Sequence, residues 1–455
     1  MPRARGKIGI QRLNVAQFSP VGQLPAMDTL TAARAQMEVS LGFHMIFAAL
    51  GIGMPLMLLI AEALWLRTGR PHYRELARQW AKATALTFAV GAVSGTALSF
   101  ELGLLWPEFM RLAGPTIGSA FTLEGFAFFI EAIFLGLYLY GWERLSPRAH
   151  FLTSIPIALS GLLSGILVVA VNSYMQYPAL DAAGQPRVDP LAPFQSPAWF
   201  HMSLHSSLSC YIATGFAAAG VYALGMLRGR HDDYHRSAIR IALAVATVTA
   251  VLQPISGDLS ARKVAELQPA KLAAAEALFV TERGAPLLIG GWPDTEAQQV
   301  RYAIEIPRAL SFLAYHDFNA EVAGLDRVPR ADWPNVLITH LAFQVMVGCG
   351  FLLAAVGVLY WITQWRGRPP GRLLLRLLLL VAPLGMLALE AGWIVTEVGR
   401  QPWVITGVMR TADAVTTVDD VQLTFMGFCI LYVVLGAVLV LLLRRLAHNR
   451  RVAYG

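Results

Sequence analysis

Long apolar runs alternate with short polar connections along most of the chain. Nine runs are long enough to cross roughly 30 Å of hydrocarbon as helices. They are expected at approximately residues 37–66, 80–104, 118–142, 151–176, 197–227, 237–254, 336–363, 372–397 and 420–444. No internal repeat is evident. The pattern predicts an all-α, polytopic membrane protein with about nine transmembrane helices.

The longest polar stretch separates the sixth and seventh apolar runs. It contains ARKVAELQPAKLAAAEALF, which predicts helix on both sides of a proline break. A structureless loop of this length would be unusual, which indicates a function. The N-terminal residues lack the apolar core of a signal peptide, and Met27 is an alternative start. The chain is divided into a partly disordered leader (1–36), six helices (37–254), the polar segment (255–335), three helices (336–445) and a tail (446–455).

Basic residues are concentrated in alternate connections between the apolar runs. These are the connections after the first, third, fifth and seventh runs and the C-terminus, represented by Arg74, Arg148, Arg236, Arg372 and Arg445. Cytoplasmic loops carry an excess of Lys and Arg. We therefore expect a cytoplasmic C-terminus, and both the N-terminus and the 255–335 segment on the outer side.

Composition supports a membrane protein and narrows the chemistry. The chain is 56% hydrophobic and 14% charged, whereas soluble domains carry about 25% charged residues. The net charge of +7 reflects the basic connections, so no nucleic-acid partner is expected. Cys210, Cys349 and Cys429 lie singly in apolar runs, which favours core positions over a disulfide framework or a zinc site.

Ionisable side chains inside a membrane are costly and are therefore functional candidates. Six side chains are expected at a similar depth near the outer face: His44, Glu101, Glu124, His205, Met346 and Glu397. Independent polar core residues would scatter in depth, so a shared depth indicates one layer of bound cofactor. Glu62, at the inner end of the first helix, is expected to reach the interface.

His205 and Met346 form the most informative pair, because imidazole and thioether are axial ligands of six-coordinate haem iron. Taken alone, each is more simply a core residue. Their matched depth and small neighbours favour a flat macrocycle between the helices; the neighbours are Ser203, Ser206, Ser207, Ser209, Gly348 and Gly350. His201, one turn earlier, is a rival ligand.

Glu124 and Glu131 are seven residues apart, which places both carboxylates on one helix face, roughly 10 Å apart in depth. Two carboxylates stepping into a membrane are typical of a proton relay. The alternative is a pair of buried acids satisfied by neighbouring helices.

Five motifs together resemble subunit I of cytochrome bd, a quinol-oxidising terminal oxidase. They are GFHMIF around His44, EGFAFFIEA at 124–132, KLAAAEA at 271–277, MVGCG at 346–350 and GWIVTEVGRQPW at 392–403. Their order and spacing cover nearly the whole chain. GRQPW after a membrane helix is the most specific element.

The resemblance implies the cofactors and the residues that hold them. His205 and Met346 would ligate a low-spin haem b. The electrons would then reach two high-spin haems, one haem b and the other haem d or a b-type substitute. His44, Glu124 and Glu397 would bind at these two haems, and the sequence leaves open which residue belongs to which iron. Arg400, Trp403 and Trp393 would hold haem groups nearby, and Glu131 would lie on the proton path.

The resemblance also assigns the polar segment as a short quinol-binding Q-loop, with Lys271 and Glu276 in catalysis. From the sequence alone, an ordinary solvated Ala-rich helix is the favoured interpretation there. Gln344 departs from the family, in which several members have arginine. A missing cation is expected to lower the low-spin haem potential.

The implied reaction is oxidation of ubiquinol or menaquinol at the outer face and reduction of O2 to water with cytoplasmic protons. This reaction generates a proton gradient without pumping. The protein is expected to cross the bacterial cytoplasmic membrane several times and to assemble with a second membrane subunit. A small accessory subunit is a further candidate partner. The alternatives are a proton-coupled transporter, which lacks the support of an inverted repeat, and a haem b quinol dehydrogenase without oxygen chemistry.

Overall fold

The computed structural model describes residues 27–454, with side chains as far as residue 447. The expected leader falls outside this range up to residue 26. The first helix begins at Thr29, within the range expected for the leader. The Asp28 carboxylate caps this helix by accepting a hydrogen bond from the Thr31 backbone N–H at 3.0 Å, which satisfies one of the free donors of the first turn.

Nine apolar segments of the described chain are long enough to span a membrane, as predicted. They are α1 (Thr29–Thr68), α2 (Pro71–Leu105), α3 (Pro107–Tyr140), α4 (Pro147–Gln176), α6 (Trp199–Leu227), α7 (Asp233–Leu267), α10 (Val336–Trp365), α11 with α12 (Arg372–Val381 and Leu384–Val398) and α14 (Val421–Tyr454). Several begin with a proline in their first turn, where a missing N–H breaks no helical bond.

The largest boundary error concerns α7, which was expected to end at residue 254. The helix instead continues through Pro254 to Leu267, because neighbouring helices let a membrane helix tolerate proline. The predicted break is confirmed further on: Gln268 ends α7 and α8 (Pro269–Ala275) follows directly.

Short elements lie in the connections. They comprise α5 (Ala192–Gln195), α9 (Ala309–Tyr315), α13 (Thr411–Ala414) and the 3-10 turns η2 (Leu325–Arg327) and η3 (Arg330–Asp332). Three antiparallel two-stranded sheets were not predicted: β1 (Glu282–Arg283) with β4 (Glu321–Val322), β2 (Leu287–Asp294) with β3 (Gln299–Ile306), and β5 (Trp403–Ile405) with β6 (Met409–Arg410). The spanning part is all helical, as expected.

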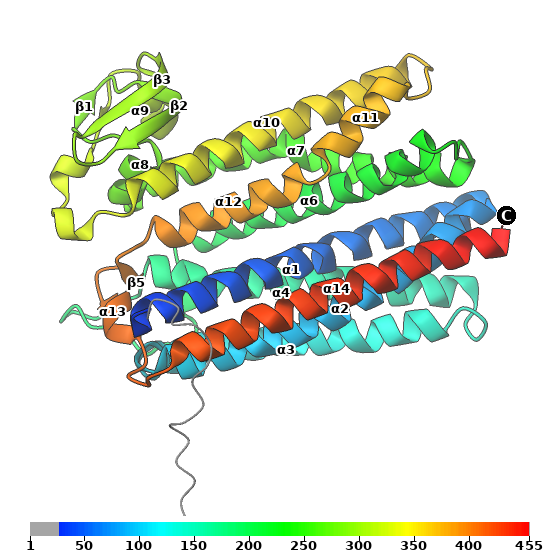
Figure 1. Cartoon of the computed structure of the whole chain (residues 1–455), viewed down its shortest axis with the longest axis horizontal. Coiled ribbons are helices and arrows are strands. Elements are labelled where there is room, and N and C mark those ends of the chain that lie inside the picture. The colour runs from blue at the N-terminus through cyan, green and yellow to red at the C-terminus, as the bar shows by residue number, and fades with distance from the viewer. Residues whose placement is uncertain (1–26, 455) are drawn as a thin grey trace, which may run out of the picture.

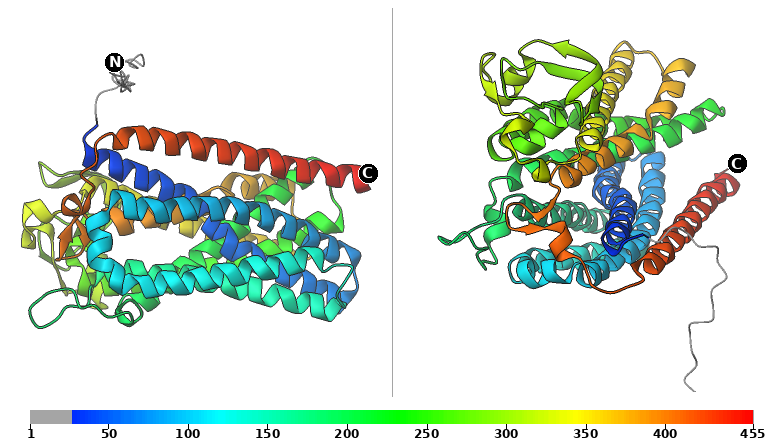
Figure 2. Two further views of the ribbon diagram at one scale, coloured as in Figure 1. Left: turned by 90° about the horizontal axis from the view of Figure 1, so that it is seen from below. Right: turned by 60° about the vertical axis from the view of Figure 1, so that its left-hand side comes forward.

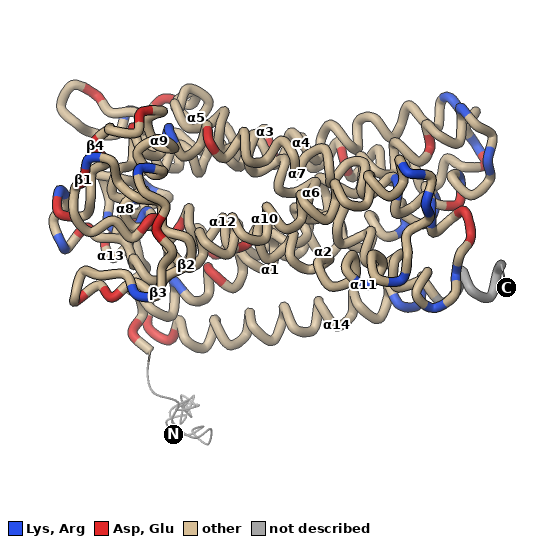
Figure 3. Tube along the Cα trace, turned by 90° about the horizontal axis from the view of Figure 1, so that it is seen from above, with Lys and Arg blue, Asp and Glu red and all other residues tan. Residues whose placement is uncertain are grey.

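The long helices lie side by side, with the β2–β3 hairpin, α8 and α9 at one end and the C-terminus at the other (Figure 1). An oblique view, turned so that the end with the β2–β3 hairpin comes forward, shows α10 and α11 on one flank and α3 on the opposite one (Figure 2). Lys and Arg gather at the end that carries the C-terminus (Figure 3). The basic connections therefore share one end of the bundle, as their alternation predicted.

Candidate functional site

A cavity of about 1030 Å³ lies among α6, α7, α8, α10, α12 and β2. Its lining includes His205 and Met346 together with Lys271, Glu276 and Trp393. Residues assigned from sequence to haem binding and to the outer segment thus meet in one space. The volume is at the upper end of the roughly 300–1,000 Å³ that is usual for pockets binding small molecules.

The two proposed axial ligands face this cavity with donor atoms free. Ser256 Oγ lies 3.3 Å from His205 Nδ1, which leaves Nε2 for another partner. Met346 Sδ lies 3.0 Å from the point that a Cβ on Gly392 would occupy. Only glycine at position 392 therefore leaves the thioether this room.

Small side chains supply space around these ligands. Ser206 and Ser209 line the cavity from α6, and Gly348 and Gly350 line it from α10. An imidazole and a thioether in such a cavity are a donor set that suits haem iron. The residues present therefore fit a haem.

His201, the rival ligand, lies one turn outward on the same cavity. Its Nδ1 is 3.1 Å from Ser260 Oγ. Its Nε2 is buried and has no hydrogen-bond partner among the described residues. His201 can therefore offer a nitrogen to whatever fills the outer half of the cavity.

Lys271 and Glu276 are 7% and 4% exposed, so the interpretation as a solvated helix is wrong. Burial lowers the pKa of Lys271 to about 7, with the nearby Arg400 charge adding to the effect. Burial raises the pKa of Glu276 to about 8, and its Oε2 has no hydrogen-bond partner among the described residues. Both groups can therefore gain and lose protons near neutral pH.

Gln344 also lines the cavity. Its side-chain amide forms two hydrogen bonds with the backbone of β2, so the residue has a structural role of its own at the position where several family members have arginine. Its Oε1 accepts from Gly290 N–H at 2.9 Å, and its Nε2 donates to Leu288 O at 3.0 Å. One turn earlier, His340 Nδ1 and Nε2 lie 2.9 and 3.0 Å from Ala275 O and Gly290 O. The two side chains of α10 hold β2 and the end of α8 together.

His44 has the hydrogen-bond arrangement of a metal ligand. Its Nδ1 lies 2.9 Å from Ser94 Oγ, and that hydroxyl donates to Gly91 O at 3.1 Å. When the hydroxyl proton goes to Gly91 O, His44 Nδ1 carries a proton and donates it to Ser94 Oγ. Nε2 then keeps its lone pair for a metal.

The carboxylates predicted at the high-spin haems contact α4 but do not share one depth. Ser164 Oγ donates to Glu124 Oε1 at 2.9 Å, and Asn172 Nδ2 donates to Glu397 Oε1 at 2.5 Å. These two α4 residues are eight positions apart, or about 12 Å along the helix axis. The expectation of a single layer is therefore wrong, because the candidates are staggered along the bundle.

Glu131 is 5% exposed and reaches the same helix. Its Oε2 lies 3.3 Å from the point that a Cβ on Gly161 would occupy. Its Oε1 has no hydrogen-bond partner in the described part of the chain. An unpaired buried carboxyl is costly in a purely structural role, which favours the relay interpretation over a satisfied core acid.

Arg400 forms an ion pair with Glu397 Oε2. Its Nε and Nη1 are buried and have no acceptor among the described residues. Unsatisfied guanidinium donors suit an anionic group such as a haem carboxylate. Trp403 instead pairs across β5–β6 with Arg410, whose guanidinium lies 4.8 Å from the ring centroid.

Glu62 does not reach the interface, contrary to expectation. Its side chain is fully buried, and its Oε1 lies 2.6 Å from His150 Nδ1. His150 Nε2 donates to Tyr138 O at 2.9 Å, and Tyr138 continues the seven-residue row of Glu124 and Glu131 on α3. Sequence reasoning did not find the Glu62–His150 pair because the two residues lie on different helices, α1 and α4.

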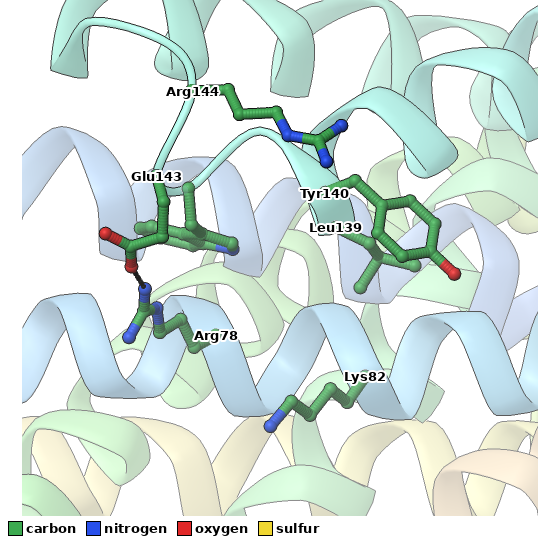
Figure 4. Close-up of a pocket in the computed structure, with 7 residues that line it drawn as sticks. Arg78, Lys82, Leu139, Tyr140, Glu143 and Arg144 are labelled. Carbon is green, nitrogen blue, oxygen red and sulfur yellow. Dashed lines mark hydrogen bonds and ion pairs between the residues drawn. The ribbon is translucent and has the colours of Figure 1, made fainter.

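A pocket of about 440 Å³ opens beside this pair, at the basic end of the bundle. In Figure 4, Glu143 accepts from Arg78 at 2.5 Å, with Arg144 and Lys82 nearby. Trp142 lines the pocket, and its ring centroid is 4.0 Å from that of His150. The Trp142 ring therefore touches both this surface pocket and the buried His150 of the pair.

Sequence reasoning missed two further polar residues. Glu390 lies seven residues before Glu397 on α12, with its Oε1 buried and unpaired among the described residues; that spacing was a usable signal. Asp258 lines the main cavity and pairs with Arg262 at 2.9 Å. Glu101, which the sequence did single out, is buried. Ser40 and Gln36 donate to its Oε1 at 2.8 and 3.1 Å, whereas its Oε2 has no hydrogen-bond partner among the described residues.

Comparisons with known proteins point to one family. Residues 32–451 match the family described as cytochrome bd terminal oxidase subunit I. A putative cytochrome bd menaquinol oxidase subunit I of Bacillus subtilis (strain 168) is 38% identical over 427 residues, covering 92% of this chain and 96% of that protein. The cytochrome bd-II ubiquinol oxidase subunit 1 of Escherichia coli (strain K12) is 27% identical, covering 88% and 92%. The solved bd oxidase of Geobacillus thermodenitrificans is 39% identical, with a TM-score of 0.87 over 93% of this chain and 99% of that one.

Proposed function

Because the chain belongs to the family of cytochrome bd oxidase subunit I, we propose that it oxidises quinol at the Lys271–Glu276 end of the cavity and passes the electrons inward to O2. Members of this family are quinol:O2 oxidoreductases of the bacterial inner membrane that work with a subunit II. The observation that carries the proposal is that His205, Met346, Lys271 and Glu276 line one cavity.

His205 and Met346 would hold a low-spin haem b, and His44, Glu124 and Glu397 would serve a high-spin haem b and a haem d or its b-type substitute. The bound haems supply one-electron transfer and the site at which O2 is reduced. Arg400 offers its two unpaired donors to an anionic group beside Glu397. Trp393 forms part of the cavity wall.

At the outer end, Glu276 would take a proton from the quinol, and Lys271 would stabilise the anion that remains. Oxidation of one quinol to quinone releases two electrons and two protons. A carboxyl with a pKa of about 8 is close to the operating pH, where a group that accepts and then releases a proton works best. Ubiquinol and menaquinol both fit this chemistry.

Protons for O2 reduction would come from the opposite end of the bundle through Glu131. That end carries the basic connections (Figure 3) and would face the cytoplasm, with the N-terminus and the β2–β3 hairpin outside. Protons released outside and consumed inside would create a gradient without pumping. The complex would also contain a small accessory subunit beside subunit II.

A reduced-minus-oxidised absorption spectrum of the purified complex, recorded with and without quinol, tests this function. We expect low-spin and high-spin haem bands, both reduced by quinol and reoxidised by O2. A protein without haem would support a proton-coupled transporter. Low-spin haem alone would support a quinol dehydrogenase without oxygen chemistry.

A further inference from the structure

A continuous row of hydrogen bonds leaves the main cavity and ends at Glu397. Lys271 Nζ donates to Gln176 Oε1 at 2.5 Å, and Gln176 Nε2 donates to Asn172 Oδ1 at 3.3 Å. Asn172 Nδ2 then donates to Glu397 Oε1 at 2.5 Å. Lys271 and Gln176 line the cavity, whereas Asn172 and Glu397 do not. The row therefore crosses the cavity wall.

The middle of this row is buried and held from several sides. Gln176 is 1% exposed. Gln268 Nε2 donates to Gln176 Oε1 at 2.8 Å, and Gln176 Nε2 also reaches Thr396 O at 3.5 Å. Both polar atoms of the Gln176 amide are thus engaged, which fixes its orientation.

Which group donates and which accepts in each hydrogen bond of the row follows from its outer end, at Lys271. The Lys271 ammonium and the Gln268 amide N–H groups can only donate, so they hold the carbonyl of Gln176 toward the outer segment. The Gln176 NH2 must then face Asn172. Asn172 consequently presents its carbonyl to Gln176 and its NH2 to Glu397. Reversing one amide would set two donors or two acceptors against each other, so neither amide can turn alone.

A packing contact joins the same two regions independently. Gly399 lies between Glu397 and Arg400, and a Cβ placed on it would be 3.0 Å from Lys271 Cγ and 3.4 Å from Lys271 Cε. The lysine stem therefore rests against the backbone at the end of α12. Movement of Lys271 changes both this contact and the amide row.

We propose that Gln176 and Asn172 are positioning residues that couple the occupancy of the Lys271 site to the orientation of Glu397. The coupling rests on the proposed function, in which Lys271 meets quinol and Glu397 serves a high-spin haem. When the Lys271 ammonium turns to a quinone oxygen, Gln176 loses its strongest donor. The change is passed through Asn172 to Glu397 Oε1, so the oxygen-reducing end senses whether the quinol site is filled.

The test uses the oxidised, haem-loaded complex with ubiquinone-1, a short-chain quinone that can bind without being oxidised. The readouts are the absorption and the electron paramagnetic resonance of the ferric high-spin haem. In the parent, adding the quinone should shift the high-spin signal. Asn172→Leu, close to asparagine in size, should retain the haems and quinone binding but lose this shift.

Two further variants keep the test decisive. Gln176→Glu can still accept from Lys271 but cannot donate to Asn172, so it should also lose the shift. Asn172→Ser is a smaller change for the case in which the leucine variant does not assemble. Ser160→Ala is the matched control, because Ser160 lies on α4 but donates only within its own helix, to Pro156 O at 2.6 Å and Ile157 O at 3.3 Å; its shift should equal that of the parent.

The outcomes separate the coupling from the function itself. A parent that carries haem and oxidises quinol but shows no quinone-induced shift overturns the coupling alone. So does a variant of Gln176 or Asn172 that keeps the full shift. A parent without haem, or one that does not oxidise quinol, overturns the proposed function and the coupling with it.

Discussion

Replacing Gln344 by leucine should loosen the β2–β3 hairpin while leaving the haem-binding residues in place. Leucine is similar in size to glutamine but can neither donate nor accept a hydrogen bond. The substitution removes the acceptor of Gly290 N–H and the donor to Leu288 O, now at 2.9 and 3.0 Å. His340 still holds Gly290 O at 3.0 Å, so the hairpin should open locally and not detach.

The size of the effect follows from the two backbone groups that lose their partners. A buried polar group left unsatisfied costs about 1–3 kcal/mol. Gly290 and Leu288 are half-buried, and water can reach them, so we expect about 1–3 kcal/mol for the pair together. Because every 1.4 kcal/mol is tenfold, local opening should become about 5–150 times more frequent.

Hydrogen exchange followed by mass spectrometry measures this opening directly. Amides of β2, and Gly290 N–H above all, should exchange faster in Gln344→Leu, while those of α6 should not change. The KM for quinol should rise, since β2 forms part of the cavity wall. Gln364→Leu is the control, because Gln364 is half-buried near the C-terminal end of the same helix, twenty residues from Gln344.

A second substitution separates the hydrogen bonds of Gln344 from the effect of charge. Gln344→Arg introduces a cation and should raise the potential of the low-spin haem, whereas Gln344→Leu should leave that potential nearly unchanged. Unaltered exchange of the β2 amides in Gln344→Leu would refute the reasoning, because the hairpin would then not depend on this side chain.

Three further variants test the proposed roles. Met346→Leu should abolish the low-spin haem band and keep high-spin absorption; an unchanged spectrum would exclude Met346 as a ligand. In the parent, quinol oxidation should rise as the pH approaches about 8, where Glu276 loses its proton, and Glu276→Gln should remove this dependence without altering the haem bands; a variant with the parent's pH profile would contradict the role. Glu131→Gln should keep the haems and accept electrons from quinol but stall in O2 consumption, and full turnover would rule out an essential relay.

The sequence predicted the spanning helices well because their formation depends on a local property. A run of apolar residues long enough to cross the hydrocarbon must form a helix to satisfy its backbone. Helix ends were predicted less well. For example, α7 continues through Pro254 to Leu267, beyond its expected end. The small sheets depend on pairing between segments, as in β1 with β4, and local pattern carries little information about such pairing.

The candidate site was predicted only as far as single residues reveal their chemistry. His205 and Met346 stand out because a histidine and a methionine in small-residue surroundings suit a haem, and both do line one cavity; their ligation stays a prediction. Glu62 was misassigned because its partner His150 comes from another helix.

Asn172 and Gln176 show most clearly where sequence reasoning stops. Two amides one turn apart on a membrane helix resemble ordinary polar core residues. Their role becomes visible only from their partners in the fold. Asn172 bonds to Glu397, 225 positions away along the chain, and Gln176 bonds to Lys271, 95 positions away. Within hydrocarbon an amide must find partners inside the protein, and here each partner belongs to a region with its own proposed chemistry. The need to satisfy two buried amides is therefore enough to bring the quinol-binding segment and a proposed haem ligand into one hydrogen-bonded unit.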